Sequence, residues 1–158
     1  MKINYRILAV FTAVLLFLNV PVCGAADVQS KRIDTAVSAL AGLNVMHGYE
    51  DGSFHTERQV TRMEFVALVL RVMGIDELTA GMGNTMPFPD VDPSSWGAGA
   101  VQTAVAMGLI NGHDNGMFEP DLPVTVNQAA KIMVNVLGYG VEAEKQSGYP
   151  VGYLSTAN

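Results

Sequence analysis

Apolar side chains recur at helical spacing in four short segments of this 158-residue chain. Residues three and four positions apart lie on one face of an α-helix, so each segment predicts an amphipathic helix with one buried face. The apolar faces are, in chain order, Val37, Leu40 and Ala41; Phe65, Leu68, Val69 and Val72; Val101, Ala104 and Val105; and Ala129, Ile132, Met133 and Val136. Gly74 and Gly138 follow the second and fourth segments, where they predict helix ends.

The third and fourth segments repeat the first and second. Residues 36–75 align with residues 100–139 at a constant offset of 64, and nine of the 40 aligned pairs are identical. The identical pairs are Ala36/Ala100, Val37/Val101, Gly48/Gly112, Gly52/Gly116, Phe54/Phe118, Val60/Val124, Thr61/Thr125, Val72/Val136 and Gly74/Gly138. The sequence therefore predicts an all-α fold of tandem helix-loop-helix units, each of which packs on its neighbour.

The loop inside each unit has the residues of a tight turn. Gly52 and Gly116 stand where the chain reverses, and we expect both to have positive φ. Phe54 and Phe118 follow two residues later, where we expect each to be buried as the chain returns to the core.

Residues 1–25 have the order of a secretory signal peptide. Lys2 and Arg6 precede an apolar run at residues 7–20, and small residues follow that run. The run has 14 residues, whereas a membrane-spanning helix needs about 20. We therefore expect export, removal of this segment and no membrane span in the mature chain.

A lipid anchor on Cys23 is the alternative for the N-terminus, because bacterial lipoproteins are processed at a cysteine just after the apolar run. The preceding residues 20–22 are Val-Pro-Val, whereas that processing favours a small residue directly ahead of the cysteine. Cleavage after Ala25 or Ala26 would remove the single cysteine of the chain. The mature protein would then have neither disulfides nor thiol catalysis.

The mature chain is acidic. From Ala26 onward it keeps seven of the nine Lys and Arg residues and all 15 acidic residues, which gives a formal net charge of 7 − 15 = −8. A protein of this charge does not coat nucleic acids nonspecifically. A mature length of about 130 residues supports one modest core, which suits small units that pack on one another.

Several short motifs, in the right order, resemble the S-layer homology (SLH) repeat. They are Phe-Pro-Asp-Val at residues 88–91, Trp96, Gly-Leu-Ile-Asn-Gly at 108–112, Gly-Met-Phe-Glu-Pro at 116–120, Gly-Tyr-Glu-Asp-Gly-Ser-Phe at 48–54 and Val-Thr-Arg-Met-Glu-Phe at 60–65. The resemblance implies repeats packed around a pseudo-threefold axis that hold exported proteins on the bacterial cell wall. It also implies a ligand, the secondary cell-wall polysaccharide attached to peptidoglycan, which often carries pyruvate.

The resemblance suggests a division of the chain. The expected parts are a signal peptide at 1–25, SLH repeat 1 at 27–76, a linker at 77–87, SLH repeat 2 at 88–140 and the truncated start of SLH repeat 3 at 148–158, after a polar stretch at 142–147. Repeat 1 begins irregularly, since Arg32 occupies the position of Trp96. We expect weak polysaccharide binding by so few complete repeats, and a partner repeat or an oligomer could cover their apolar faces.

Thr61 and Glu64 have the spacing of a helix capping box. The threonine hydroxyl accepts from the amide of residue 64, and the carboxylate accepts from the amide of residue 61. Thr125 and Gln128 repeat the arrangement, with an amide in place of the carboxylate. This comparison favours a structural role for both residues, although both also lie in the segment where the resemblance puts the polysaccharide site.

Arg62 is the candidate ligand-binding residue. Its counterpart in the second copy is Val126, so a helix can start here without a cation. An arginine in the first turn opposes the helix dipole unless an anion is near, and the free amides there, with the guanidinium, could grip a carboxylate of the glycan. The alternative is a solvated arginine paired with Glu57 or Glu64.

Trp96 completes the candidate site. It lies four residues before Ala100, so the helical pattern favours a core position. The alternative is an exposed ring on which a sugar stacks.

The remaining residues offer little other chemistry. His47, His55 and His113 lack the spacing of metal ligands. The loop at 111–116 is similar to part of a calcium loop, but residue 122 is leucine where the closing glutamate should stand. No nucleophile elbow or phosphate loop occurs, so we expect no metal, no cofactor and no catalysis.

Two hypotheses for the function follow. The first is a noncatalytic module that anchors an exported protein to secondary cell-wall polysaccharide on the bacterial surface or S-layer. The second is the targeting region of a secreted cell-wall or polysaccharide-degrading enzyme whose catalytic domain lies outside this chain.

Overall fold

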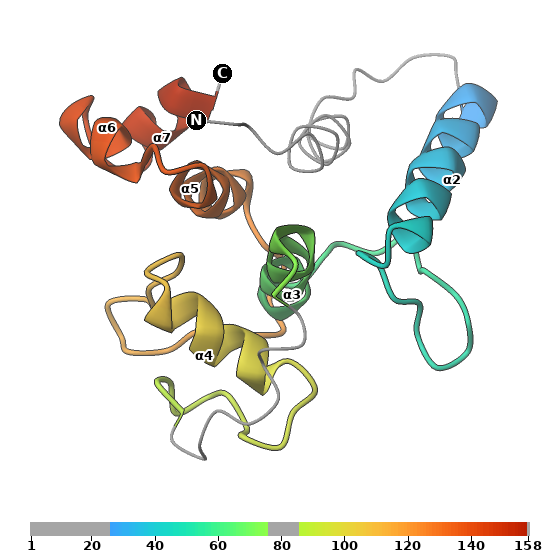
Figure 1. Ribbon diagram of the computed structural model, residues 1–158, viewed down its shortest axis with the longest axis horizontal. Coiled ribbons are helices and arrows are strands. Elements are labelled where there is room, and N and C mark those ends of the chain that lie inside the picture. The colour runs from blue at the N-terminus through green and yellow to red at the C-terminus, as the bar shows by residue number, and fades with distance from the viewer. Residues whose placement is uncertain (1–25, 76–85, 158) are drawn as a thin grey trace. The chain divides into compact units, whose positions relative to one another are not determined.

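The computed structural model describes residues 26–75 and 86–157, which form six helices (Figure 1). They are α2 (Ala26–Gly42), α3 (Arg62–Met73), α4 (Ala98–Ala106), α5 (Val126–Val136), α6 (Gly140–Lys145) and α7 (Val151–Ala157). The described residues contain no strand, only one isolated antiparallel β-bridge between Thr61 and Pro123. The prediction of an all-α fold is therefore confirmed. The expected signal peptide and most of the expected linker lie outside the described residues.

The chain forms two compact units. Among the described residues, unit 1 consists of residues 26–58 and 71–74, and unit 2 of residues 59–70, 75 and 86–157. Helix α2 belongs to unit 1, while α4 to α7 and most of α3 belong to unit 2. No helix in the described part of the chain is long and apolar enough to cross a membrane.

The four helices predicted from the apolar pattern are confirmed. On α2, Val37 and Leu40 are buried, and on α4 Val101 and Ala104 are among the least exposed residues. The sequence placed these side chains on one helix face because they recur three and four residues apart. Gly74 and Gly138 end α3 and α5 with φ of 76° and 82°, as expected for glycines after a helix. The buried faces of these helices supply the core.

The turns of the two copies have the same backbone hydrogen bonds at the offset of 64. The paired bonds are Tyr49 N to Ser53 O (2.9 Å) with His113 N to Met117 O (2.8 Å), and Gly52 N to Tyr49 O (2.8 Å) with Gly116 N to His113 O (2.8 Å). Gly52 and Gly116 have φ of 78° and 77°, so the predicted positive φ is confirmed at both positions. Local sequence alone is enough to form this turn.

Both capping boxes are present. The amide of Thr61 donates to Glu64 at 2.8 Å and the amide of Glu64 donates to the Thr61 hydroxyl at 3.2 Å. At α5 the matching distances between Thr125 and Gln128 are 2.9 and 3.3 Å. The capping role predicted for these residues is confirmed.

The region after α5 is more helical than its sequence suggests. The stretch 142–147 reads as polar, yet α6 forms across most of it. The cause is tertiary packing, because Ala143 is fully buried against Val134 of α5 and Tyr153 of α7. Gly152 of α7 lies so close to the Ala143 carbonyl that a Cβ there would clash with it.

Two predictions about aromatic burial need correction. Trp96 was expected in the core but is 63% exposed. Helix α4 begins only at Ala98, with Gly97 as its N-cap, so the four-residue spacing from Trp96 to Ala100 does not put both on one helix face. Phe118 is fully buried as expected, whereas Phe54 is only half-buried.

Candidate functional site

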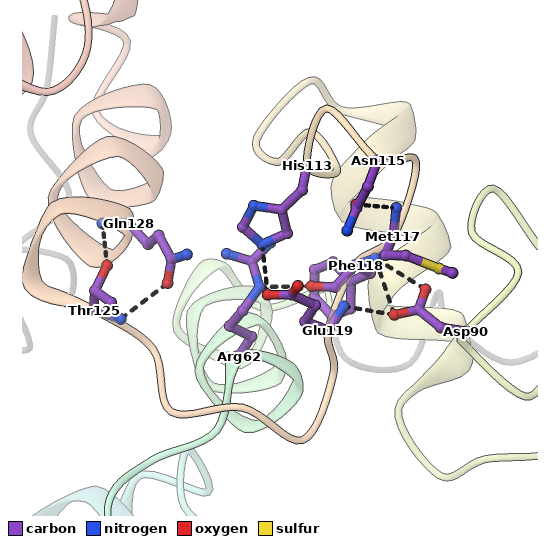
Figure 2. A network of polar contacts seen from close by, with 9 residues as sticks. All are labelled: Arg62, Asp90, His113, Asn115, Met117, Phe118, Glu119, Thr125 and Gln128. Atoms are coloured by element: carbon purple, nitrogen blue, oxygen red, sulfur yellow. Dashed lines mark hydrogen bonds and ion pairs between the residues drawn. The ribbon is translucent and has the colours of Figure 1, made fainter.

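Arg62 is a buried cation at the start of α3. Only 6% of the residue is exposed. Its Nε donates a hydrogen bond to the Phe118 carbonyl at 2.7 Å, and its guanidinium lies over the Phe118 ring, 4.8 Å from the ring centroid (Figure 2). Cation–π contacts strengthen when both partners are removed from water. Arg62 therefore connects the start of α3 to a loop 56 residues further along the chain.

The alternative for Arg62, a solvated side chain paired with Glu57 or Glu64, is wrong. The Glu57 carboxylate contacts the His55 ring at 3.1 Å, and the Glu64 carboxylate accepts from the Thr61 amide. A solvated arginine paired with one of these acids does not occur. The planar guanidinium is instead covered by an aromatic ring and a carbonyl.

The free helix amides expected at the start of α3 do not occur either. Arg62 N donates to Leu122 O at 2.9 Å and Met63 N donates to Pro120 O at 3.1 Å. The next amide is taken by the Thr61 hydroxyl, and the following one, of residue 65, donates to the Thr61 carbonyl. A carboxylate ligand consequently finds no open amide cradle at this helix end.

Arg62 stays charged although its pKa is lowered from the ordinary value. Burial lowers the pKa of the guanidinium from its ordinary value, while the nearby Glu119, Tyr149 and Asp90 act to raise it. An arginine side chain stays protonated in proteins, so this site holds a fixed positive charge with acidic groups around it.

Asp90 holds the loop that covers Arg62. Its carboxylate accepts from the Phe118 amide at 2.9 and 3.1 Å and from the Glu119 amide at 2.7 Å (Figure 2). Glu119 has a φ of 60°, a conformation that side chains other than glycine rarely adopt. The bond from its amide helps to hold this conformation. The Phe88 ring stacks on Phe118 with 5.5 Å between centroids.

The same hydrogen bonds change the acidity of Asp90. Partial burial acts to raise its pKa, but the amides of Phe118 and Glu119 and the charge of Arg62 outweigh burial, and the pKa is lowered from its ordinary value. Asp90 is therefore a carboxylate across the neutral range, where it can accept all of these hydrogen bonds.

His113 borders the cluster. Its Nε2 lies 3.2 Å from Glu119 Oε2, although the two atoms do not have hydrogen-bond geometry. Within the described part of the chain, no group of three or more His, Cys, Asp or Glu side chains is arranged to hold a metal ion.

Trp96 lies next to the α3 start through its neighbour in sequence. Gly97 packs so closely on Met63 that an added Cβ would lie 2.5 Å from the Met63 Cγ. The structure thus brings together Thr61, Arg62 and Glu64 at one helix start. Gly97, the residue after the exposed Trp96, packs on Met63 of the same turn.

Sequence reasoning missed the supporting residues Asp90, Phe118 and Glu119. All three belong to motifs that carry the SLH resemblance, at residues 88–91 and 116–120. These motifs are the signal in the sequence that could have identified the three residues. Their contact with Arg62 was not visible, because it joins segments that are distant in sequence.

The model of the S-layer homology domain matches residues 26–66 and 87–130. The chain belongs to the S-layer homology family. A cell surface protein of Thermoanaerobacter kivui is 31% identical over 124 residues, covering 78% of this chain and 16% of that protein. The cellulosome-anchoring protein of Acetivibrio thermocellus is 30% identical over 92 residues, covering 58% of this chain and 21% of that protein.

An enzyme name also occurs among the relatives. Endo-1,4-beta-xylanase A of Thermoanaerobacterium saccharolyticum is 31% identical over 87 residues, 54% of this chain and 7% of that protein. The chain thus spans less than a quarter of the length of each of these three relatives.

Proposed function

We propose that this chain is a noncatalytic anchoring module that holds an exported protein on the bacterial cell surface. The proposed ligand is the secondary cell-wall polysaccharide attached to peptidoglycan. The observation that carries the proposal is the SLH match over both repeats. Relatives named as a cell surface protein and a cellulosome-anchoring protein support it.

The proposed contact surface is the exposed ring of Trp96 beside the start of α3. At 63% exposure, the indole offers a flat apolar face to a sugar ring, with its N–H as a polar handle. Arg62 contributes positive charge that attracts an acidic glycan. Thr61 and Glu64 act by fixing the helix start that carries this charge.

Arg62 has a second part in this proposal. Its Nε is committed to the Phe118 carbonyl, so the guanidinium is held in one orientation before any ligand arrives. A preorganised charge loses less side-chain freedom on binding than a mobile one. Asp90 and Phe118 are therefore positioning residues for Arg62.

The test of the function is cosedimentation of the exported protein with purified cell-wall sacculi. We expect the protein to pellet with intact sacculi and to remain in the supernatant after acid extraction has removed the secondary polysaccharide. Pelleting that survives the extraction would show that the polysaccharide is not the ligand.

Trp96→Ala tests the contact surface. We expect the dissociation constant for sacculi to rise about tenfold, or about 1.4 kcal/mol, since exposed aromatic anchors are frequent binding hot spots. Tyr139→Ala is the matched control, because Tyr139 is a 47% exposed aromatic residue at the N-cap of α6. Equal binding by both variants would exclude Trp96 from the site.

A second candidate function is delivery of a secreted enzyme to the wall. The observation that favours it is the similarity to the xylanase relative. In that case the repeats bind the wall in the same way, and the exported protein also carries a catalytic domain. Assays of the complete exported product on xylan and on cell-wall polymers would separate the two functions, since a pure anchoring protein releases no product.

A further inference from the structure

Two Asn-Gly pairs lie in the segment between α4 and α5. They are Asn111-Gly112 and Asn115-Gly116, and no other asparagine in residues 1–157 precedes a glycine. Glycine has no Cβ, so its amide nitrogen can approach the side chain of the preceding asparagine without steric hindrance. Asparagine in this setting can lose its side-chain amide without an enzyme, and the structure around each pair decides which of the two reacts.

Hydrogen bonds hold both reacting groups of the second pair. Asn115 Oδ1 accepts from the Met117 amide at 2.9 Å (Figure 2), and the Gly116 amide donates to the His113 carbonyl at 2.8 Å. The attacking nitrogen and the side chain under attack are thus both engaged in a closed turn. Asn115 must break both of these bonds before its side chain can react.

The first pair has no such bonds. Asn111 is exposed and lies outside any helix or hydrogen-bonded turn. Its side chain makes no hydrogen bond with a described residue, and the Gly112 amide donates to none of them. An amide without a protein partner normally bonds to water, and water can remove its proton. Both reacting groups of this pair are therefore available in the folded protein.

We propose that Asn111 is a self-modification site, at which the folded chain deamidates. The Gly112 nitrogen, after its proton has passed to water, forms a bond to Asn111 Cγ, and the bond from Cγ to Nδ2 breaks with release of ammonia. The product is a five-membered succinimide ring. Water then opens the ring at one of its two carbonyl carbons, which gives aspartate or isoaspartate at position 111. The net reaction exchanges ammonia for water, without oxidation or reduction, and does not involve the proposed polysaccharide.

The surroundings of Gly112 make isoaspartate the damaging product. Isoaspartate runs the backbone through the former side chain and adds one methylene directly ahead of Gly112. This glycine has no room to move, since a Cβ added to it would clash with the Phe88 ring. Phe88 stacks on Phe118, which Arg62 covers. The added methylene therefore disturbs the aromatic pair under Arg62, whereas ordinary aspartate keeps the length of the backbone.

Incubation of the exported protein at mildly alkaline pH, followed by mass spectrometry, tests the proposal. Fragmentation of the peptide that contains both pairs separates positions 111 and 115 and distinguishes isoaspartate from aspartate. In the folded protein we expect Asn111 to convert about tenfold or more faster than Asn115, which must first break two hydrogen bonds. In denaturant the two rates should become similar, because glycine follows both residues. Equal rates in the folded protein, or faster conversion of Asn115, would overturn the proposal.

Two variants provide a matched comparison. Asn111→Asp removes the amide of the first pair, and Asn115→Asp removes that of the second. Asn115→Asp keeps its turn, because Asp51 at the equivalent position of the first copy accepts from the Ser53 amide at 2.9 Å. We expect ammonia release from the folded protein to be largely lost in Asn111→Asp and almost unchanged in Asn115→Asp. The reverse result would contradict the assignment to Asn111.

Urea unfolding of the aged protein tests the consequence for unit 2. After chromatographic separation, the form with isoaspartate at position 111 should unfold at a lower urea concentration than the fresh protein. Freshly prepared Asn111→Asp should unfold as the fresh protein does, since its backbone has the normal length. Trp96 fluorescence follows the transition. Equal stability of the isoaspartate form would overturn the part assigned to Gly112.

Discussion

Arg62→Ala is expected to lower the free energy of unfolding of unit 2 by about 2–4 kcal/mol. The variant loses a charge-assisted hydrogen bond worth about 1.5–3 kcal/mol and a desolvated cation–π contact worth about 2 kcal/mol, partly offset because no charge is buried any longer. Urea unfolding measures the change. Trp96 is the only tryptophan of the chain and lies in unit 2, so its fluorescence reports this unit while circular dichroism reports all helices.

Two variants make the Arg62 result specific. Arg62→Lys keeps the charge but lacks the planar group that stacks on Phe118 and the Nε–H that its carbonyl accepts, so we expect it to recover less than half of the loss. Arg32→Ala removes an exposed arginine of α2 and should change stability by less than about 0.5 kcal/mol. Full stability in Arg62→Lys would mean that charge alone is needed and would contradict the role of the stacked guanidinium.

Asp90→Asn is expected to lower the stability of unit 2 by about 1–3 kcal/mol. The carboxylate accepts from two backbone amides, and an asparagine side chain loses the charge and presents one donor group to amides that need acceptors. Asp92→Asn is a matched control two residues away. Asp92 caps an exposed turn through the Ser94 amide and hydroxyl, so its loss should be clearly smaller.

The pH dependence provides a second test of the Asp90 carboxylate. Because the folded-state pKa of Asp90 is lowered from the ordinary value of 3.8, its contribution is fully present above that value and is lost as the pH falls through the lowered pKa. The stability difference between the native protein and Asp90→Asn should shrink below pH 3.8. A difference that stays constant down to the lowest pH at which unit 2 folds would argue against the carboxylate.

Local features of the fold were predictable from the sequence because local residues determine them. Gly52 and Gly116 reach positive φ since a short turn requires it. The caps at Thr61 and Thr125 need only a partner three residues away. Helices α2 to α5 follow from apolar side chains at a spacing of three and four residues.

Features that depend on distant segments were not predictable. Helix α6 owes its stability to burial of Ala143 against α5 and α7. The Arg62 side chain donates to the Phe118 carbonyl, and the backbone amides at the start of α3 donate to carbonyls at residues 120–122. Trp96 was misassigned for a different reason, because helical spacing was applied to a residue two positions before its helix.

The backbone bonds of each turn and the bonds of each capping box join residues three or four positions apart, so a copied repeat carries all of these bonds with it. The first residue of the second helix differs between the two copies, with arginine at position 62 and valine at position 126. A copied repeat with arginine at this position brings with it a side chain that can bind the loop of the repeat after it, as Arg62 binds Phe118.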